Sequence, residues 1–266
     1  MSPLISIITI NYNNKAGLKK TLDSVMAQTF GGYEHIIIDG ASSDGSVDVI
    51  KKTLENKKYA SHVSYWCSEK DGGIYPAMNK GLSFAKGRFI LMLNSGDWLS
   101  SEVVLAGVEP YLLKEDNSVV YGAVDYFNGS NYVNTYSVGV CELFQGKNIC
   151  HQACFVAKKI HDEIGVYDTA YKLWADYDFM LRSYTSSVSF VHIPIIVANC
   201  EKQGASNLNK DALKSDIKRI KKVYFPCENE LLLIIKKILK LLVPELVFVI
   251  YRFFKGAVGK LFVKRW

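Results

Sequence analysis

Acidic side chains in three separate segments have the chemistry and the placement to form a polar site. Asp39 and Asp97 each come at the end of an apolar run, and Asp176 lies in the segment "WADYDF". A carboxylate in such a place can accept hydrogen bonds from a ligand, hold a hard cation such as Mg²⁺ or Mn²⁺, or act as a general base. These three residues are therefore the first candidates for binding and catalysis.

Asp44, Asp176 and Asp178 also have a purely structural explanation, which is harder to apply to Asp39 and Asp97 because each directly ends an apolar strand. Asp44 stands just before Ser46, where a helix is expected to begin, and is most easily explained as a helix cap. Asp176 and Asp178 can be two carboxylates of a first helical turn, which the helix dipole favours. Since residues two apart on a helix point roughly 200° apart, only one of these two can face a cleft.

Short apolar runs alternate with helical patterns over residues 5–93 and predict the elements that position these side chains. The expected strands are Ile5–Ile10, His35–Ile38, Val63–Trp66 and Phe89–Leu93, and the expected helices run through Leu18, Leu22 and Val25, over Val47–Leu54 and over Tyr75–Ala85. This alternation predicts parallel strands with right-handed crossovers, in a doubly wound α/β sheet. Such sheets bind ligands beyond the carboxyl ends of their strands, where Asp39 and Asp97 both fall.

The second half of the chain has a looser pattern. We expect Asn- and Tyr-rich hairpins from Tyr121 to Tyr136, a helix over Trp174–Tyr184, and strands over Val188–His192 and Ile195–Asn199. Residues 210–223 then predict an amphipathic helix. Its expected buried side consists of Leu213, Ile217, Ile220 and Val223.

Composition and charge narrow the class of protein. Hydrophobic residues make up 49% of the 266 residues and charged residues 22%, which is typical of a packed globular chain and excludes disorder. The segment from Leu231 to Trp266 carries eight Lys or Arg and one acid, for a charge of +7, whereas residues 1–230 have a net charge of −1. We expect no nucleic-acid partner, because the positive excess is confined to the C-terminal segment.

The six cysteines and the N-terminus indicate a reducing compartment. The cysteines show no CxxC pair, so free buried thiols are expected, and a zinc site at Cys150 and Cys154 would lack two ligands. An apolar strand begins at Leu4 with no charged leader or cleavage site before it, which argues against secretion.

Six ordered motifs resemble the family 2 glycosyltransferases of the GT-A type that build bacterial capsule, O-antigen and exopolysaccharide. They extend from Ser6 to about Ser206 and read "SIITINYNN", "QTFGGYEHIIIDGASSDGS", "SEKDGGIYPAMNKG", "GRFILMLNSGDWL", "HQACFVAKK" and "IGVYDTAYKLWADYDFMLR". The resemblance implies a GT-A, Rossmann-like mixed sheet flanked by helices. It also implies one glycosyltransferase domain over residues 1–225, with a nucleotide-sugar half of about 1–120 and an acceptor half of about 121–225.

The same resemblance implies roles for residues on the donor side. Residues of the nucleoside and diphosphate site would be Asn11, Tyr12, Asp39, Asp71, Asn79, Lys80, Ser95 and Gly96. Asp97 would be the metal-binding end of the family's Asp-x-Asp element and would hold Mg²⁺ or Mn²⁺. Because Ser95 replaces the first aspartate of that element, a single carboxylate is available for the metal.

On the acceptor side, the resemblance implies that Asp176 is the general base and Asp178 its structural neighbour. His151 and Gln152 would lie close to both substrates, and Trp174 would support a sugar ring. Ala175 replaces the Glu of the family's Glu-Asp pair. The implied reaction is inverting transfer of one sugar from a nucleotide-diphosphate sugar, expected to be a UDP-sugar, to a lipid-linked undecaprenyl-diphosphate saccharide. The alternative is a catalytically inert, membrane-bound scaffold of a polysaccharide assembly complex.

Residues 226–266 are expected to form basic amphipathic helices. The segment "LLLIIKKILKLLV" places Lys236, Lys237 and Lys240 in an otherwise apolar pattern, and Pro244 interrupts it. The longest wholly apolar run, Leu246–Tyr251, is far shorter than the roughly 20 residues of a membrane span. We therefore expect residues 231–266 to bind a membrane surface, peripherally at the cytoplasmic face of the inner membrane. The alternative is a homo-oligomer interface or packing on the catalytic domain.

Overall fold

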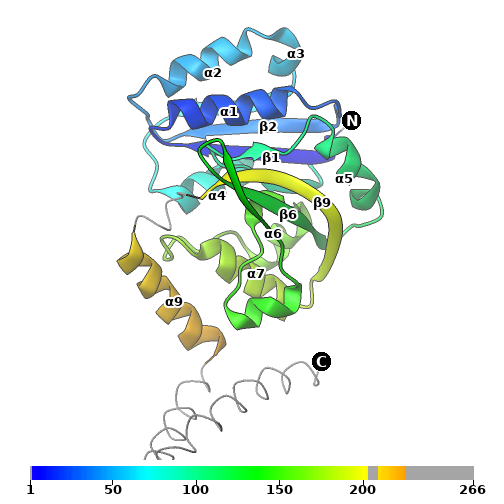
Figure 1. Ribbon diagram of the computed structural model, residues 1–266, viewed down its shortest axis with the longest axis vertical. Coiled ribbons are helices and arrows are strands. Elements are labelled where there is room, and N and C mark those ends of the chain that lie inside the picture. The colour runs from blue at the N-terminus through cyan, green and yellow to red at the C-terminus, as the bar shows by residue number, and fades with distance from the viewer. Residues whose placement is uncertain (1, 203–208, 226–266) are drawn as a thin grey trace, which may run out of the picture.

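A computed structural model describes residues 2–202 and 209–225 of the chain. The predicted helices of residues 226–266 lie outside this range, as does Ser206 at the end of the family resemblance. Within it, the elements of regular structure form one sheet with helices around it (Figure 1).

The sheet has nine strands in the order β3-β2-β1-β4-β8-β6-β9-β5, with β7 paired to β6. The strands are β1 Ile5–Asn11, β2 Tyr33–Asp39, β3 Val63–Ser68, β4 Phe89–Met92, β5 Trp98–Leu99, β6 Ser118–Asn128, β7 Asn131–Tyr136, β8 Cys154–Ala157 and β9 Ser189–Glu201. Strands β3, β2, β1 and β4 are parallel, whereas β8 runs antiparallel to both β4 and β6. The predicted mixed sheet flanked by helices is confirmed.

The helices surround this sheet. They are α1 Lys15–Met26, α2 Ser46–Leu54, α3 Lys57–Ala60, α4 Ile74–Phe84, α5 Val104–Leu112, α6 Lys158–Ile164, α7 Ala175–Thr185 and α9 Lys210–Tyr224, with 3-10 turns η1 Val140–Gln145 and η2 His151–Ala153. Figure 1 shows α2 and α3 at one end of the long axis of the molecule and α9 towards the other.

The parallel half forms where the sequence is most continuously apolar. Every residue of β2 is buried, as is all of β1 except Ile10, because helices cover both faces of these strands. Helix α4 packs so closely on them that a Cβ at Gly81 would lie 2.4 Å from Ile8 Cγ2. A glycine is therefore required at this contact.

A buried polar chain joins β1, β2 and α3. Thr9 donates to the carbonyl of Leu93, and its hydroxyl oxygen lies 2.9 Å from Nε2 of His35, whose Nδ1 lies 2.5 Å from the hydroxyl of Tyr59. Burial lowers the pKa of His35 to about 3, so its ring is neutral. With Nε2 as the donor to Thr9, Nδ1 accepts from Tyr59, and all three side chains are satisfied.

Two details of the second half differ from the sequence prediction. The segments expected as separate strands, Val188–His192 and Ile195–Asn199, belong to the single strand β9, which keeps Pro194 exposed and shifts register against β6. On α9, Val223 is 58% exposed, and the buried residues are Ile220 and Asp216. The buried face of α9 is therefore partly acidic.

The described residues bear on two further expectations. Cys67, Cys141, Cys150, Cys154 and Cys200 are free thiols, although Cys141 is exposed. None of the helices within residues 2–202 and 209–225 has both the length and the apolar character needed to cross a membrane.

Candidate active site

A cleft of about 1540 Å³ opens beyond the carboxyl ends of β1 and β4. Its walls come from the loops after these strands, the start of α4, η2, the hairpin of β6 and β7, and the start of α7. This is the edge at which parallel α/β sheets bind ligands. Residues from Ile10 to Lys202 therefore meet at one site.

A tight turn holds Asp97 at the edge of this cleft. Gly96 has a φ of +104°, a conformation that favours glycine, and the amide of Asp97 donates to the carbonyl of Asn94. The hydroxyl of Thr21 on α1 donates to the carbonyl of Asp97 at 2.6 Å and accepts from the amide of Gly96 at 3.0 Å. The turn is therefore fixed to the helix beneath it.

The Asp97 carboxylate is buried, with 9% of the residue exposed. Burial raises the pKa of Asp97 to about 6, even though Gln152 Nε2 donates to its Oδ2 at 2.8 Å. The Gln152 amide is itself oriented by the thiol of Cys150, which donates to Oε1. A cation would relieve this buried charge.

Asp176, in the first turn of α7, carries its charge in a different setting. Its Oδ1 accepts from the hydroxyl of Tyr75 at 2.9 Å, and its Oδ2 accepts from Asn148 Nδ2 at 2.7 Å and lies 3.2 Å from His151 Nδ1. Burial alone would raise the pKa of Asp176, but these hydrogen bonds and the attraction of His151 hold it below its ordinary value. Asp176 is therefore ionised near neutral pH.

The imidazole of His151 lies between Asp176 and Asn94. Burial disfavours its charged form, but the hydrogen bond to Asp176 and the nearby negative charges raise the pKa of His151. Asn94 Nδ2 lies 3.1 Å from Nε2 of the neutral ring. Asn94 Oδ1 is buried with no hydrogen-bond partner in residues 2–202 and 209–225, and a half turn of the amide would present it to a protonated ring. The pair can therefore accommodate both protonation states.

The η2 turn joins the two carboxylates across the cleft. His151 contacts Asp176 while its neighbour Gln152 contacts Asp97. Strand β8 follows this turn directly and pairs antiparallel with β4, which fixes η2 beside the carboxyl end of β4. The candidate metal ligand and the candidate base are thus held in one network.

Most of the residues predicted for binding also line the cleft. These are Asn11, Tyr12, Asp71, Ser95, Gly96, His151, Gln152 and Trp174, together with Asp97 and Asp176. Tyr12 is 68% exposed, so its ring is free to stack on a ligand. The individual roles of these residues stay predictions.

Asp39 lies behind the wall of the cleft. It is fully buried and accepts hydrogen bonds from Asn11 Nδ2, from the amide and hydroxyl of Ser42, and from the hydroxyl of Ser68. Burial would raise the pKa of Asp39, but these donors lower it. Asp39 therefore organises the loops after β1, β2 and β3, and its effect on a ligand passes through Asn11.

Asn79 and Lys80 on α4 are also absent from the cleft wall. Asn79 exchanges two hydrogen bonds with the backbone of Tyr167, at 2.8 and 3.0 Å. Lys80 contacts the carboxylate of Glu69 and the thiol of Cys67. In this structure both residues tie α4 to neighbouring segments.

Sequence reasoning missed three residues of the network. Tyr75 was placed only in a helix, and Asn148 stands in a loop with no distinguishing pattern. Asn94 could have been found, because it directly follows an apolar strand and begins the turn that contains Asp97. The hairpin residues Tyr126 and Tyr136 at the cleft wall carried no such signal.

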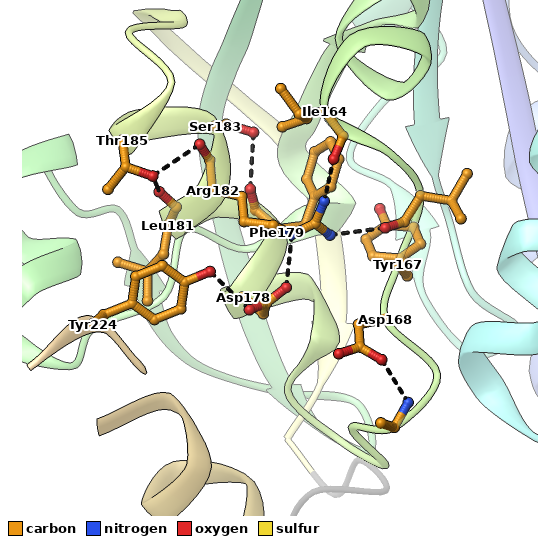
Figure 2. Close-up of polar contacts among 12 residues, drawn as sticks. Ile164, Tyr167, Asp168, Asp178, Phe179, Leu181, Arg182, Ser183, Thr185 and Tyr224 are labelled. Atoms are coloured by element: carbon orange, nitrogen blue, oxygen red, sulfur yellow. Dashed lines mark hydrogen bonds and ion pairs between the residues drawn. The ribbon is translucent and has the colours of Figure 1, made fainter. Parts of the chain in front are cut away.

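Asp178 faces away from the cleft. It is 5% exposed, and its carboxylate accepts from Arg182 Nε and from the hydroxyl of Tyr224, each at 2.8 Å. Figure 2 shows Asp178 between these two side chains. Asp176 and Asp178 therefore occupy different surroundings, as expected for residues two apart on a helix.

Comparison with known proteins places the chain in a family. The family model for glycosyl transferase family 2 matches residues 6–165. A "PGL/p-HBAD biosynthesis glycosyltransferase" of Mycobacterium bovis (strain BCG / Pasteur 1173P2) is 31% identical over 221 residues, which is 80% of this chain and 84% of that protein. The putative teichuronic acid biosynthesis glycosyltransferase TuaG of Bacillus subtilis is 37% identical over 95 residues, 36% of either chain.

Solved structures share the fold. S. aureus TarS 1–349 in complex with UDP-GlcNAc has a TM-score of 0.62 at 17% identity, over 76% of this chain and 59% of that one. The mannosyltransferase PcManGT from Pyrobaculum calidifontis, in complex with GDP-Man and Mn²⁺, has a TM-score of 0.60 at 14% identity, over 78% of this chain and 60% of that one. The chain thus spans about three fifths of each.

The family match covers more than half of the chain, and a relative above 30% identity covers most of it. The chain belongs to glycosyl transferase family 2 and is a glycosyltransferase.

Proposed function

We propose that this enzyme transfers a single sugar, with inversion, from a UDP-sugar to a lipid-linked saccharide in bacterial surface polysaccharide assembly. The observation that carries the proposal is the pairing of Asp97 and Asp176 in one cleft, joined through Gln152 and His151. One carboxylate is suited to a cation at a leaving diphosphate, and the other to an incoming hydroxyl.

The donor class is supported by the cleft and by structural likeness. Tyr12 offers an exposed ring for stacking on a base, and Asn11 at the end of β1 and Asp71 in the loop after β3 line the same cleft. The structures with a shared fold hold UDP-GlcNAc and GDP-Man, both of them nucleotide-diphosphate sugars. Of the two, we propose the UDP class for this chain.

The residues around Asp97 fit a divalent cation that is shared with a ligand. Its carboxylate is buried, and Asn94 Oδ1, which has no hydrogen-bond partner among the described residues, is the kind of oxygen that Mg²⁺ or Mn²⁺ binds. Within the described part of the chain, no three His, Cys, Asp or Glu side chains are gathered to hold a metal alone. We therefore propose that Asp97 and diphosphate oxygens hold the cation together, where it would neutralise charge on the leaving group.

The proposed mechanism is a single in-line displacement. The acceptor oxygen forms a bond to the anomeric carbon while its proton passes to Asp176, and the bond from that carbon to the diphosphate oxygen breaks with its electron pair. Tyr75 and Asn148 hold the carboxylate of Asp176 at fixed orientation. Attack opposite to the leaving group inverts the anomeric centre.

We further propose an undecaprenyl-diphosphate-linked acceptor and a peripheral location at the cytoplasmic face of the inner membrane. The names of the relatives, which refer to PGL/p-HBAD and teichuronic acid biosynthesis, support a role in bacterial glycan assembly. The charge of +7 over residues 231–266 supports binding to anionic lipid.

Donor screening tests this proposal. UDP-glucose, UDP-galactose and their N-acetyl forms are each incubated with the full chain, Mg²⁺ or Mn²⁺, and a lipid-linked acceptor, and UDP release and product are measured. We expect metal-dependent transfer with one donor, and Asp176→Asn should abolish transfer while UDP still binds. Asp162→Asn, an exposed site on α6, is the matched control. Full transfer by Asp176→Asn would refute the base assignment. No turnover of these four donors would refute the proposed donor class, and no turnover of GDP-mannose as well would favour an inert scaffold.

A further inference from the structure

Helix α9 packs against the segment that leads into α7, the helix that carries Asp176. Asp216, near the middle of α9, is 5% exposed, whereas the other charged side chains of this helix are exposed. Burying a carboxylate is costly unless donors surround it, so this residue needs a structural explanation.

The donors to Asp216 are three consecutive backbone amides. Its Oδ2 accepts from the N–H groups of Lys172 at 3.0 Å, Leu173 at 2.8 Å and Trp174 at 3.2 Å. A single carboxylate oxygen thus fixes the backbone of three residues.

These amides come directly before the catalytic helix. Trp174 is the N-cap residue of α7 and supplies no side-chain cap, while Leu173, Trp174 and Asp176 all line the cleft. The negative charge of Asp216 also lies at the end of α7 that the helix dipole makes positive. The support that a local cap would give therefore comes from α9, 42 residues beyond Trp174.

Two further residues of α9, Arg219 and Tyr224, hold the helix against the domain. Arg219 donates to the Asp168 carboxylate at 3.1 Å and lies over the ring of Tyr171, 4.5 Å from its centroid. At the end of α9, the hydroxyl of Tyr224 donates to Asp178. The helix therefore contacts the segment before α7 and the first turn of α7 itself.

Figure 2 shows how the contact between Tyr224 and Asp178 continues into the domain. Asp178 lies between Tyr224 and Arg182, and the guanidinium of Arg182 donates in turn to the carbonyls of Ile164 and Val166. The face of α7 opposite to Asp176 is thus tied to α9 and to the end of α6.

We infer that Asp216 is a positioning residue for sugar transfer: by binding the amides of residues 172–174, it fixes Trp174 and Asp176 relative to the rest of the cleft. This inference rests on the proposed function. Asp97, Asn11 and Tyr12 stand on other elements, so donor binding does not depend on the contact. Loss of the contact should therefore act on turnover and on the acceptor.

The test compares Asp216→Ala and Asp216→Asn in the full chain with Asp211→Ala as the matched control. Asp211 is an acid on the same helix whose side chain is 96% exposed. We expect Asp216→Ala to lower kcat about tenfold to a hundredfold, since a displacement of about 1 Å can cost that much, with the Kd for UDP within about twofold of the wild type. Asp216→Asn keeps an accepting oxygen and should retain more of the turnover.

Hydrogen exchange of residues 172–174 supplies a readout that is independent of activity. Exchange should accelerate at these amides in Asp216→Ala and stay at the wild-type rate in Asp211→Ala. Unchanged kcat with accelerated exchange would overturn the positioning role, and unchanged exchange would overturn the contact itself. Parallel losses of kcat, UDP binding and thermal stability would also overturn it, as the sign of a structural residue. If the wild type transfers no sugar, the proposed function fails, and exchange alone decides whether Asp216 holds the segment.

Discussion

Asp97 and Asp176 are the same kind of side chain in the same cleft, yet their surroundings shift their pKa values in opposite directions. Asp97 accepts hydrogen bonds from Gln152, from Cys200 and from the backbone of Glu201, yet burial outweighs them and raises its pKa to about 6. Asp176 receives hydrogen bonds from three side chains, which keep its pKa below the ordinary value despite burial. A base should be ionised at working pH, whereas a metal ligand gains its charge stabilisation when the ion binds.

The pKa of Asp176 depends on Tyr75, which can be removed with little change in volume. Tyr75→Phe deletes the hydrogen bond to Oδ1, so the pKa of Asp176 should rise. The acid limb of the pH dependence of kcat should then move to higher pH, with kcat at neutral pH lower by about twofold to tenfold. Steady-state rates from about pH 3 to pH 9, a range that includes the ordinary Asp pKa of 3.8, would check this.

Tyr167→Phe is the control for that experiment. The ring of Tyr167 lies 5.7 Å from that of Tyr75, but its hydroxyl makes no hydrogen bond to Asp176 within the described residues. If both substitutions moved the acid limb equally, the effect could not come from the hydrogen bond to Asp176.

The buried charge of Asp97 predicts a trade between stability and function. Its folded pKa is about 6, above the ordinary 3.8, so the metal-free protein should lose stability as pH rises through about 6. Asp97→Asn removes the charge and should stabilise the metal-free protein at pH 7.5 by about 1–3 kcal/mol. The gain should vanish towards pH 4.

Thermal unfolding at pH 7.5 and pH 4 measures the change in stability, and transfer assays measure the change in activity. We expect Asp97→Asn to lose metal-dependent transfer while its Tm at pH 7.5 exceeds that of the wild type by a few degrees. An equal Tm difference at pH 4 and pH 7.5 would contradict the raised pKa.

At the scale of elements, the chain Thr9–His35–Tyr59 shows how the sheet and a short helix stabilise each other. Tyr59→Phe would leave Nδ1 of the buried His35 without its donor. We expect a loss of about 1–3 kcal/mol in the free energy of unfolding, measured with denaturant, and no change in kcat. Tyr132→Phe, on the exposed β7, should change neither quantity, and a similar loss there would point to a general effect of hydroxyl removal.

Elements of the first half could be predicted because their signals are local. Strands β1, β2 and β4 are covered on both faces and each has a mostly apolar stretch, and helices α1 and α4 have apolar residues at helical spacing. Strand β8, with only four residues, follows a 3-10 turn and is defined by its pairing with β4 and β6. Such pairing between distant segments leaves no periodicity in the sequence.

The same distinction applies to the candidate site. Asp97 and Asp176 could be proposed from strand ends and motifs, and both line the cleft. The contacts of the buried Asp39 could not be predicted, because one of its donors is the hydroxyl of Ser68 on the neighbouring strand β3. For Asp216 the apolar spacing of α9 was misleading, since the partners of its carboxylate are backbone amides, which no side-chain pattern reveals.

At the scale of the whole molecule, charge is segregated along the chain. Residues 1–230 have a net charge of −1, and residues 231–266 have a charge of +7. The described part of the chain ends with α9 at Tyr224 and the adjoining Phe225, whose ring contacts Phe144 of η1 at 5.8 Å between centroids. Among the described residues, the α9 side chains that contact the segment carrying Asp176 are Asp216, Arg219 and Tyr224, and all three precede the basic segment.

This separation predicts that membrane binding and donor chemistry can be divided. A chain ending at Asn229 keeps α9 and should release UDP from its donor at the wild-type rate, since Asp216, Arg219 and Tyr224 are all retained. It should lose flotation with vesicles that contain anionic lipid, which the full chain should bind at low salt and release as ionic strength rises. Transfer to a vesicle-bound acceptor should fall with flotation, whereas transfer to a detergent-solubilised acceptor should not.

Vesicles of zwitterionic lipid serve as the control, because attraction between charges predicts weak binding of both chains to them. Equal flotation of the two chains would assign the membrane contact to residues 1–229, and loss of UDP release on truncation would show that the basic segment takes part in the donor site.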